Sequence, residues 1–422
     1  MNHVAEIIAV GTEILLGNIA NTDAQDVSNA LSELGINVYY HSVVGDNPQR
    51  VREAVEIAKK RADVIITTGG LGPTYDDLTK QTLAECFGKE LYFDEKAADN
   101  IRELFAKHLN GAPMTENNLR QAYLPVGCTV FYNTCGTAPG CGFYADGVHV
   151  LMLPGPPREC RAMLKSGAIP YLKALSGVEI KSHNIRIFGM GESSVEDKLY
   201  DIMTEMTNPT LAPYAKEAEV MLRVTARAET DEMADAMMMP VIDKVKEIIG
   251  DFVYGVDIES LEEAVFNVLK ERGLTMCTAE SCTGGLVAKR MTDIPGASKV
   301  FLGGAVTYAT SAKEKILGVD KALLDEKGAV SEEVAIEMAK CAREKFGADV
   351  AVSLTGVAGP DKDDRGNPVG LVYIGLATAE KAFARKVFCG EQRVRARAMA
   401  SNMALDTVRR TLLDLPFPEK FM

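Results

Sequence analysis

Short apolar runs alternate with amphipathic stretches along the first third of the chain. An apolar run at residues 6–10 precedes a helical pattern at 24–34, and the alternation recurs up to the apolar run at 64–68. This order is typical of βαβ units, in which helices cover a parallel sheet. The last run, at 148–153, ends the pattern. We therefore predict a first α/β domain at residues 1–170.

The pattern changes in the middle of the chain. Apolar strands and two amphipathic helices, the second at 231–249, predict a small α+β domain at residues 175–255. Ser193 and Glu196 have the spacing of a capping box, which predicts the start of the first helix. The segment contains no catalytic pattern. We interpret it as a linker or dimerisation domain.

Alternating strands and helices return in the last third. A helical pattern at 261–272 precedes an apolar strand at 274–277, and further helical patterns follow at 332–346 and 393–413. We predict a third domain, of α/β type, at residues 258–415. The chain as a whole is therefore predicted to be an α/β protein of three domains.

Size and composition fit this organisation. The chain has 422 residues, of which 47% are hydrophobic, enough for two or three packed domains. The nine cysteines are scattered without paired spacing, which predicts reduced thiols and no zinc site. No apolar run reaches about 18 residues, and the first residues read as a strand. We expect a soluble, cytoplasmic protein without membrane contact.

The charge balance narrows the class of partner. A formal net charge of −13 argues against a nucleic-acid scaffold, because phosphate binding needs a basic surface. Arg393, Arg395 and Arg397 form one basic cluster. Its interpretations as a solvated helix face and as an anion site are both open. We expect small nucleotides as ligands and no direct nucleic-acid binding.

A glycine-rich turn follows the apolar strand of the first domain. Gly69, Gly70 and Gly72 would let the backbone approach a phosphate at the strand end, and a helical pattern follows at 76–87. The paired carboxylates Asp76 and Asp77 would repel that phosphate unless a divalent cation intervened. The alternative is a helix that simply begins with acidic residues.

A second turn of small residues, Ala279-Glu280-Ser281-Cys282-Thr283-Gly284-Gly285, lies where a strand ends and a helix begins. Free amide groups and the helix dipole would stabilise a nucleophile or an anion there. Downstream, Tyr308 and Lys313 add a phenol and an amine. A lysine whose pKa is lowered by burial can activate a serine, and a tyrosine can relay the proton. Cys282 is the rival nucleophile, because a helix N-terminus lowers a thiol pKa.

Four stretches of the first domain, at 11–18, 44–47, 68–79 and 136–140, resemble the CinA family, competence/damage-inducible protein A. The resemblance implies a molybdopterin-binding-like α/β sandwich, linked in CinA proteins to metal-dependent hydrolysis of ADP-ribose at its pyrophosphate. It implies a divalent ion, Mg, Mn or Co, on Asp46 and Asp77. The implied nucleotide-binding residues are Thr12, Glu13, Asp46, Thr68, Gly69, Gly70, Gly72, Thr74, Asp76, Asp77, Asn117 and Gln121.

Two departures from the family pattern lie in this domain. Asp23 stands where many members carry asparagine. The run Pro156-Pro157-Arg158-Glu159-Cys160 replaces the more usual Gly-Val-Pro-x-Glu-Met ending.

In the third domain, Ser281, Tyr308 and Lys313 resemble the catalytic set of the nicotinamide mononucleotide deamidase domain of CinA proteins. The resemblance implies attack of Ser281 on the carboxamide without a cofactor, and the turn's amide groups would bind the oxyanion. The chain is one residue short of the family pattern between Gly390 and Arg393. The implied substrate-binding residues are Cys282, Thr283, Gly284, Gly285, Thr355, Gly356 and Arg395.

Together these features predict a bifunctional hydrolase of pyridine-nucleotide recycling, with nicotinamide mononucleotide and ADP-ribose as substrates. The family leads us to expect a homodimer. The alternative makes the first domain a non-catalytic pterin- or nucleotide-binding module in a protein related to competence or DNA damage.

Overall fold

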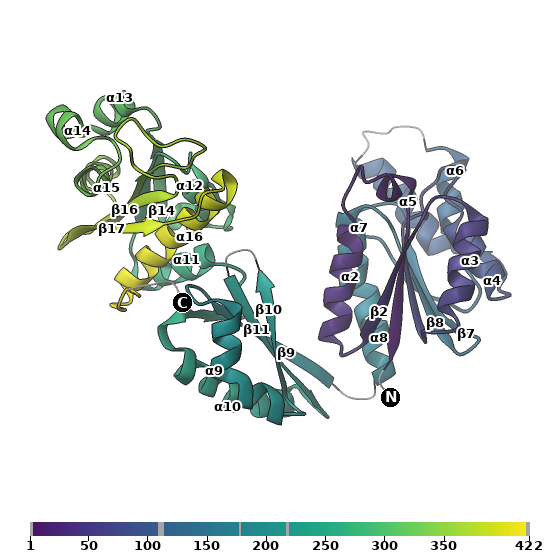
Figure 1. The fold of residues 1–422 in the computed structure, drawn as a ribbon. Coiled ribbons are helices and arrows are strands. Elements are labelled where there is room, and N and C mark those ends of the chain that lie inside the picture. Colours follow the sequence, from purple (N-terminus) through teal and green to yellow (C-terminus); the bar gives the residue numbers. More distant parts are fainter. Residues whose placement is uncertain (1–2, 109–113, 177–178, 217–218, 419–422) are drawn as a thin grey trace. The chain divides into compact units, whose positions relative to one another are not determined.

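The computed structural model describes residues 3–108, 114–176, 179–216 and 219–418. No helix within these ranges is both long and apolar enough to cross a membrane. Three principal sheets organise the chain and confirm the predicted mixed α/β class (Figure 1). The chain divides into two compact units, Met1–Ser182 with Thr225–Met237, and His183–Val224 with Met238–Met422.

The N-terminal sheet has six strands in the order β2-β1-β3-β8-β7-β6. Its first four strands are parallel, as predicted, whereas β7 and β6 are antiparallel to their neighbours. The antiparallel strands β6 and β7 were not predicted from the sequence. Asp146-Gly147, both with positive φ, is nevertheless a typical hairpin turn between β7 and β8. The strands are β1 (Val4–Val10), β2 (Asn37–Val44), β3 (Val64–Thr68), β6 (Thr129–Phe131), β7 (Gly140–Ala145) and β8 (Val148–Leu153).

Helices cover both faces of this sheet (Figure 1). Ile66 packs in the core under α2, α7 and α8, and its neighbour Ile65 packs in the core under α3 and α4. Because both faces are buried, β3 is apolar without alternation. The helices are α1 (Thr12–Leu15), α2 (Thr22–Glu33), α3 (Pro48–Ala58), α4 (Thr79–Cys86), α5 (Glu95–His108), α6 (Glu116–Leu119), α7 (Pro157–Met163) and α8 (Ile169–Ser176). Two short strands, β4 (Leu91–Phe93) and β5 (Tyr123–Pro125), form a separate antiparallel pair.

The middle segment forms a four-stranded sheet in the order β10-β11-β9-β12. The second predicted helix, α10 (Asp231–Ile249), has the expected bounds. The predicted capping box is wrong: Gly191 is the N-cap of α9 (Glu192–Glu205) and no side chain caps it, so Ser193 lies inside the first turn. The strands are β9 (Glu179–Ile187), β10 (Thr210–Lys216), β11 (Glu219–Ala228) and β12 (Val253–Val256).

The C-terminal sheet has the order β14-β13-β15-β16-β17. The strands β14, β13 and β15 are parallel, and β16 and β17 are antiparallel additions. The helices α11 (Leu261–Arg272) and α15 (Glu332–Phe346) have the bounds expected from the sequence. The other elements are β13 (Met276–Glu280), α12 (Leu286–Asp293), β14 (Phe301–Val306), α13 (Thr310–Ala312), α14 (Lys321–Lys327), β15 (Val350–Gly356), β16 (Leu371–Ala377), β17 (Ala382–Phe388) and α16 (Arg393–Leu412).

A buried ion cluster fixes the second half of α16. The Asp406 carboxylate accepts hydrogen bonds from Arg409 at 2.8 Å and from Arg410 at 2.8 Å, and all three side chains are almost fully buried. Both guanidinium groups also donate to the carbonyl of Asp251 at 3.0 Å. The backbone carbonyls satisfy donors that one carboxylate cannot. This anchoring sets the direction of α16, whose first two turns carry Arg393 and Arg397.

Replacing Asp406 by alanine should lower the free energy of unfolding by about 3–5 kcal/mol, because two buried guanidinium groups lose their anion. Denaturant titration followed by circular dichroism measures the change. Asp325→Ala is the control, since its pair with Lys321 lies at the surface and contributes little. Equal losses in the two variants would contradict the buried cluster as an anchor.

Candidate functional site

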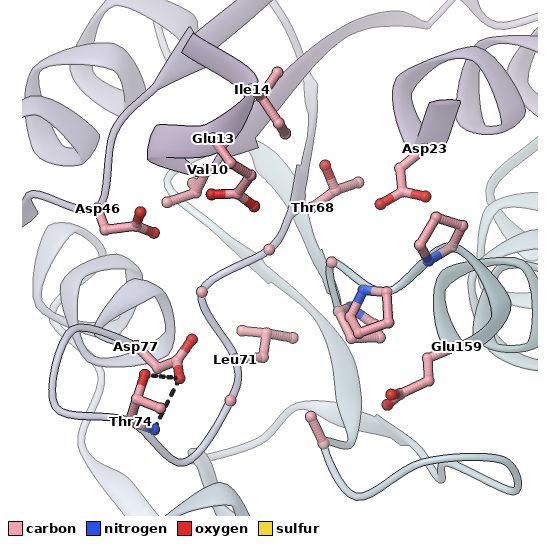
Figure 2. A pocket seen from close by; sticks show the side chains of 18 of the residues that line it. Val10, Glu13, Ile14, Asp23, Asp46, Thr68, Leu71, Thr74, Asp77 and Glu159 are labelled. Atoms are coloured by element: carbon pink, nitrogen blue, oxygen red, sulfur yellow. Dashed lines mark hydrogen bonds between the residues drawn. The ribbon is translucent and has the colours of Figure 1, made fainter. Parts of the chain in front are cut away.

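A cavity of about 560 Å³ lies at the carboxyl ends of β1, β3 and β8 (Figure 2). Ligands of open α/β sheets bind at this edge, where strand ends leave a crevice. Most of the predicted nucleotide-binding residues line it. They are Glu13, Asp46, Thr68, Gly69, Gly70, Gly72, Thr74, Asp76, Asp77 and Gln121.

The glycine turn is required by close backbone packing. A Cβ at Gly69 would lie 2.1 Å from the carbonyl oxygen of Val10, and one at Gly70 would lie 1.9 Å from Thr79 Oγ1. Both glycines also have positive φ, 94° and 66°. A side chain at either position would be strained and would clash. The turn therefore presents backbone rather than side chains to the cavity.

Threonines hold the two predicted metal ligands. Asp46 Oδ2 accepts from the amide and the hydroxyl of Thr12, both at 2.9 Å. Asp77 Oδ2 accepts from the amide of Thr74 at 2.9 Å and from its hydroxyl at 2.6 Å (Figure 2). Thr12 is absent from the cavity lining. It acts on the site by fixing Asp46.

Two other expectations are corrected here. The helix α4 begins at Thr79, so Asp76 and Asp77 precede it and face the cavity. The alternative of a helix that begins with acidic residues is therefore wrong. Asn117 is exposed on α6 and does not line the cavity. In α6 the capping box is formed by Thr115 and Asn118, so the local structure uses the neighbour of Asn117.

The cavity is strongly acidic. Six carboxylates line it, and among the described lining residues none is Lys, Arg or His. A pyrophosphate would be repelled unless a cation were bound between it and the protein. The described residues contain no group of three or more His, Cys, Asp or Glu suited to a metal. An ion held by Asp46 and Asp77 would therefore have to take most of its ligands from phosphate and water, as Mg²⁺ commonly does.

Two further carboxylates line this cavity, Asp23 and Glu159, which the sequence showed only as parts of departures from the family pattern and not as site residues. Glu159 accepts from Asn133 Nδ2 at 2.6 Å. Burial, with the nearby charge of Asp26, raises the pKa of Asp23 to about 6. Each lies at the start of a helix, where acidic residues are common, so the sequence carried no further signal.

The second site is a smaller cavity of about 190 Å³ in the C-terminal domain. Ser281 follows β13 directly, and Lys313 Nζ lies 2.8 Å from Ser281 Oγ. Lys313 is 1% exposed and also donates to the carbonyl of Thr307 at 2.8 Å. Burial lowers the pKa of Lys313 to about 8. The structure thus joins a serine hydroxyl to an amine that can accept its proton.

Tyr308 and the arginine cluster differ from expectation. The Tyr308 phenol lines the cavity, but its oxygen accepts from Arg393 Nη2 at 3.0 Å, and its backbone carbonyl is what faces Ser281 Oγ, at 3.5 Å. Arg393 lines the cavity, whereas Arg395 is exposed and does not. Positions 393 and 395 lie on opposite sides of α16. Arg397, one turn after Arg393, donates to the carbonyls of Cys282 and Thr283.

Glu280 satisfies the amides of the Ser281 turn. Its carboxylate is 0% exposed and accepts from the amides of Gly285 at 3.1 Å, Val287 at 3.1 Å and Ala288 at 2.8 Å. A carboxylate at this position offsets the dipole of α12. The amide of Gly285 is therefore not available to an oxyanion, contrary to expectation. The amides of Ser281 and Gly284 also donate to carbonyls, at 2.9 and 3.0 Å.

The remaining substrate-binding candidates divide into two groups. Cys282, Thr355 and Gly356 line the cavity, whereas Thr283, Gly284 and Gly285 do not. Thr355 donates to the carbonyl of Ala329 at 2.5 Å, which joins two walls of the site. Burial raises the pKa of the Cys282 thiol to about 11, so it is protonated at neutral pH. This contradicts the rival interpretation of Cys282 as an activated nucleophile.

Comparisons with known proteins agree with this architecture. Family models match residues 6–174 (probable molybdopterin binding domain), 182–255 (damage-inducible protein CinA KH domain) and 258–412 (CinA C-terminal domain). The CinA-like proteins of Kosmotoga olearia and Dictyoglomus turgidum are 48% and 45% identical, each over 97% of this chain and 99% of the relative. A crystal structure of the protein CinA, of unknown function, from Thermoplasma acidophilum is 37% identical over 39% of this chain and 94% of its own, with a TM-score of 0.36.

The fold and the family models define a three-domain α/β protein that joins a molybdopterin-binding-type domain to a KH-type domain and a CinA C-terminal domain. The chain belongs to the CinA family.

Glu280→Ala should destabilise the start of α12, because three amide groups lose their acceptor and each unsatisfied donor costs about 1–3 kcal/mol. Hydrogen exchange measured by mass spectrometry should accelerate at residues 285–288. Glu280→Gln keeps one acceptor oxygen and should show a smaller effect. Unchanged exchange in Glu280→Ala would show that other groups hold the turn.

Proposed function

We propose that the C-terminal domain is an amidohydrolase that converts nicotinamide mononucleotide to nicotinic acid mononucleotide and ammonia. One observation carries the proposal: the buried Lys313 amine lies 2.8 Å from Ser281 Oγ. An amine with a pKa of about 8 is neutral in about one molecule in ten at pH 7, and that form accepts a proton.

The reaction follows from this pair. Lys313 Nζ takes the hydroxyl proton while Ser281 Oγ forms a bond to the carboxamide carbon. The C–N bond then breaks, Lys313 returns the proton to the leaving nitrogen, and ammonia departs. Water attacks the ester, its proton passes by way of Lys313 to Ser281 Oγ, and the acid is released. The oxyanion would take a hydrogen bond from the amide of Cys282, which lines the cavity, because Glu280 occupies the Gly285 amide.

Arg393 is the group we assign to the substrate phosphate. It is the arginine that lines the cavity, and a guanidinium donates bidentate hydrogen bonds to phosphate. The cavity of about 190 Å³ is smaller than the roughly 300–1,000 Å³ typical of ligand sites, so it suits the carboxamide ring. The phosphate would then lie at the rim, where Arg393 is exposed.

Ammonia release should fall by at least about 1,000-fold in Ser281→Ala and by about 100-fold or more in Lys313→Met. In the wild type, the rate should rise with pH and level off above about 8, as Lys313 loses its proton. A coupled ammonia assay between pH 6 and 9.5 measures both effects. Cys282→Ala is the control and should keep most activity; loss of activity in this variant with an active Ser281→Ala would reverse the nucleophile assignment.

For the N-terminal domain we propose metal-dependent hydrolysis of ADP-ribose at its pyrophosphate. The acidic lining supports this proposal, because it fits a phosphate ligand only together with a cation. Asp46 and Asp77 would hold a divalent ion, Mg, Mn or Co, which would polarise the phosphate oxygens. Thr12 and Thr74 keep the two carboxylates oriented. The backbone of the glycine turn would bind the diphosphate.

The two activities should separate by mutation. Asp77→Ala should lower ADP-ribose hydrolysis about 100-fold or more and leave ammonia release intact, and Ser281→Ala should do the reverse. Chelation with EDTA should abolish only the first activity. Liquid chromatography of AMP and ribose 5-phosphate, run beside the ammonia assay, measures both. If the wild type binds a nucleotide or pterin without hydrolysing ADP-ribose, the domain is the non-catalytic module considered above.

The expected homodimer, cytoplasmic location and absence of nucleic-acid binding stay predictions of this proposal. Analytical ultracentrifugation tests the first, and titration with duplex DNA tests the last.

A further inference from the structure

Asp23 is a buried carboxylate that lines the acidic cavity, and one of its two oxygens has no protein donor. It lies in the first turn of α2, is 7% exposed, and its Oδ1 atom has no hydrogen-bond partner in the described structure. Figure 2 shows it across the cavity from Asp46 and Asp77. A buried, unpaired acceptor costs free energy until a donor reaches it.

The other carboxylates of the cavity are different. Asp46 accepts from the Thr12 hydroxyl, Asp77 accepts from the Thr74 amide and shares the Thr74 hydroxyl with Asp76, and Glu159 accepts from an asparagine. The sixth carboxylate, Glu13, is exposed to water. Asp23 alone among them combines burial with an unused acceptor atom.

The nearest cation does not pair with Asp23. Arg161 on α7 donates to Asp26 Oδ2 at 2.7 Å, one turn farther along α2. The titratable groups acting on Asp23 are thus Asp26, which raises its pKa, and Arg161, which lowers it, with the buried thiol of Cys160 beside them. Burial is the largest cause of the raised pKa. The charge of Arg161 therefore compensates the burial of Asp23 only in part.

We propose that Asp23 binds the vicinal hydroxyl groups of a ribose in the nucleotide held by this cavity, and so selects ribonucleotides over deoxyribonucleotides. The proposal rests on the proposed pyrophosphatase function. Two adjacent hydroxyls offer two donors to the two oxygens of one carboxylate, as in dinucleotide sites where an acidic residue binds ribose. A phosphate is excluded at Asp23 by charge. ADP-ribose carries a ribose on either side of its diphosphate, so with the diphosphate on the glycine turn one ribose could lie at Asp23.

The test is calorimetric binding of ADP-ribose and of two analogues, each lacking the 2′-hydroxyl of one ribose, at pH 7.5 with Ca²⁺ in place of the proposed catalytic ion, after chromatography has shown that the ligands stay intact. In the wild type, one analogue should bind about 10- to 100-fold more weakly, which identifies the ribose. Asp23→Ala should weaken ADP-ribose to a similar degree and bind that analogue no worse than ADP-ribose. Equal binding of all three ligands by the wild type, or an unchanged preference in Asp23→Ala, would overturn the proposal.

Asp26→Asn is the matched control, because this carboxylate lies next to Asp23 but outside the cavity lining. At pH 7.5 the Asp26→Asn variant should keep the wild-type preference for ADP-ribose over the analogue that lacks one 2′-hydroxyl. In the wild type the preference should fade below about pH 6 as Asp23 gains a proton. In Asp26→Asn it should persist to lower pH, since a negative neighbour is gone and Arg161 is released. A purely structural role for Asp23 would not shift this pH.

If the wild type does not bind ADP-ribose, the pyrophosphatase proposal is contradicted, but the ribose-binding proposal is still tested. Binding of AMP is then compared with binding of 2′-deoxy-AMP. An Asp23-dependent preference for AMP would support the ribose site by itself. Its absence would overturn the inference.

Discussion

Carboxylates that accept hydrogen bonds from backbone amides at the carboxyl ends of parallel strands shape both candidate sites. Glu280 binds three amides at the start of α12, and Asp46 and Asp77 bind the amides of Thr12 and Thr74. An unsatisfied amide in such a tight turn is costly, so these contacts hold the turns in one conformation. The Ser281 hydroxyl and the glycine turn are positioned by that constraint.

The two sites use burial in opposite ways. In the C-terminal cavity, burial lowers the pKa of Lys313 to about 8, so that its neutral form, which can accept the Ser281 proton, is populated near neutral pH. In the N-terminal cavity, six carboxylates gather without a cation among the described lining residues, so the site requires its positive charge from a ligand. In this cavity, burial is the largest cause of the raised pKa of Asp23 and so opposes its ionisation. Under the proposed functions, the C-terminal domain would use a neutral amine and the N-terminal domain a bound metal ion.

Contacts between residues far apart in the chain determine which arginine of α16 reaches the C-terminal cavity. The sequence contained three alternating arginines and no means to choose among them. The buried cluster around Asp406 anchors one part of the helix, and Arg397 ties its first turns to the Ser281 turn. With the rotation of the helix set in this way, Arg393 reaches the cavity and Arg395 points to solvent. Helical periodicity separates the two, but the burial that selects a face is tertiary.

Several features were determined by the sequence alone. Strong periodicity predicted α10, α11 and α15 with their bounds, and glycine and serine turns at strand ends located both sites. Local patterns succeed there because backbone propensity and one-sided burial act over a few residues. Only the tertiary structure decided that β6 and β7 extend the first sheet, that Glu280 occupies the amides of the Ser281 turn, and that Asp23 lines a cavity with one oxygen lacking a protein donor. Those facts depend on contacts and desolvation between residues far apart in the chain, which a local pattern does not encode.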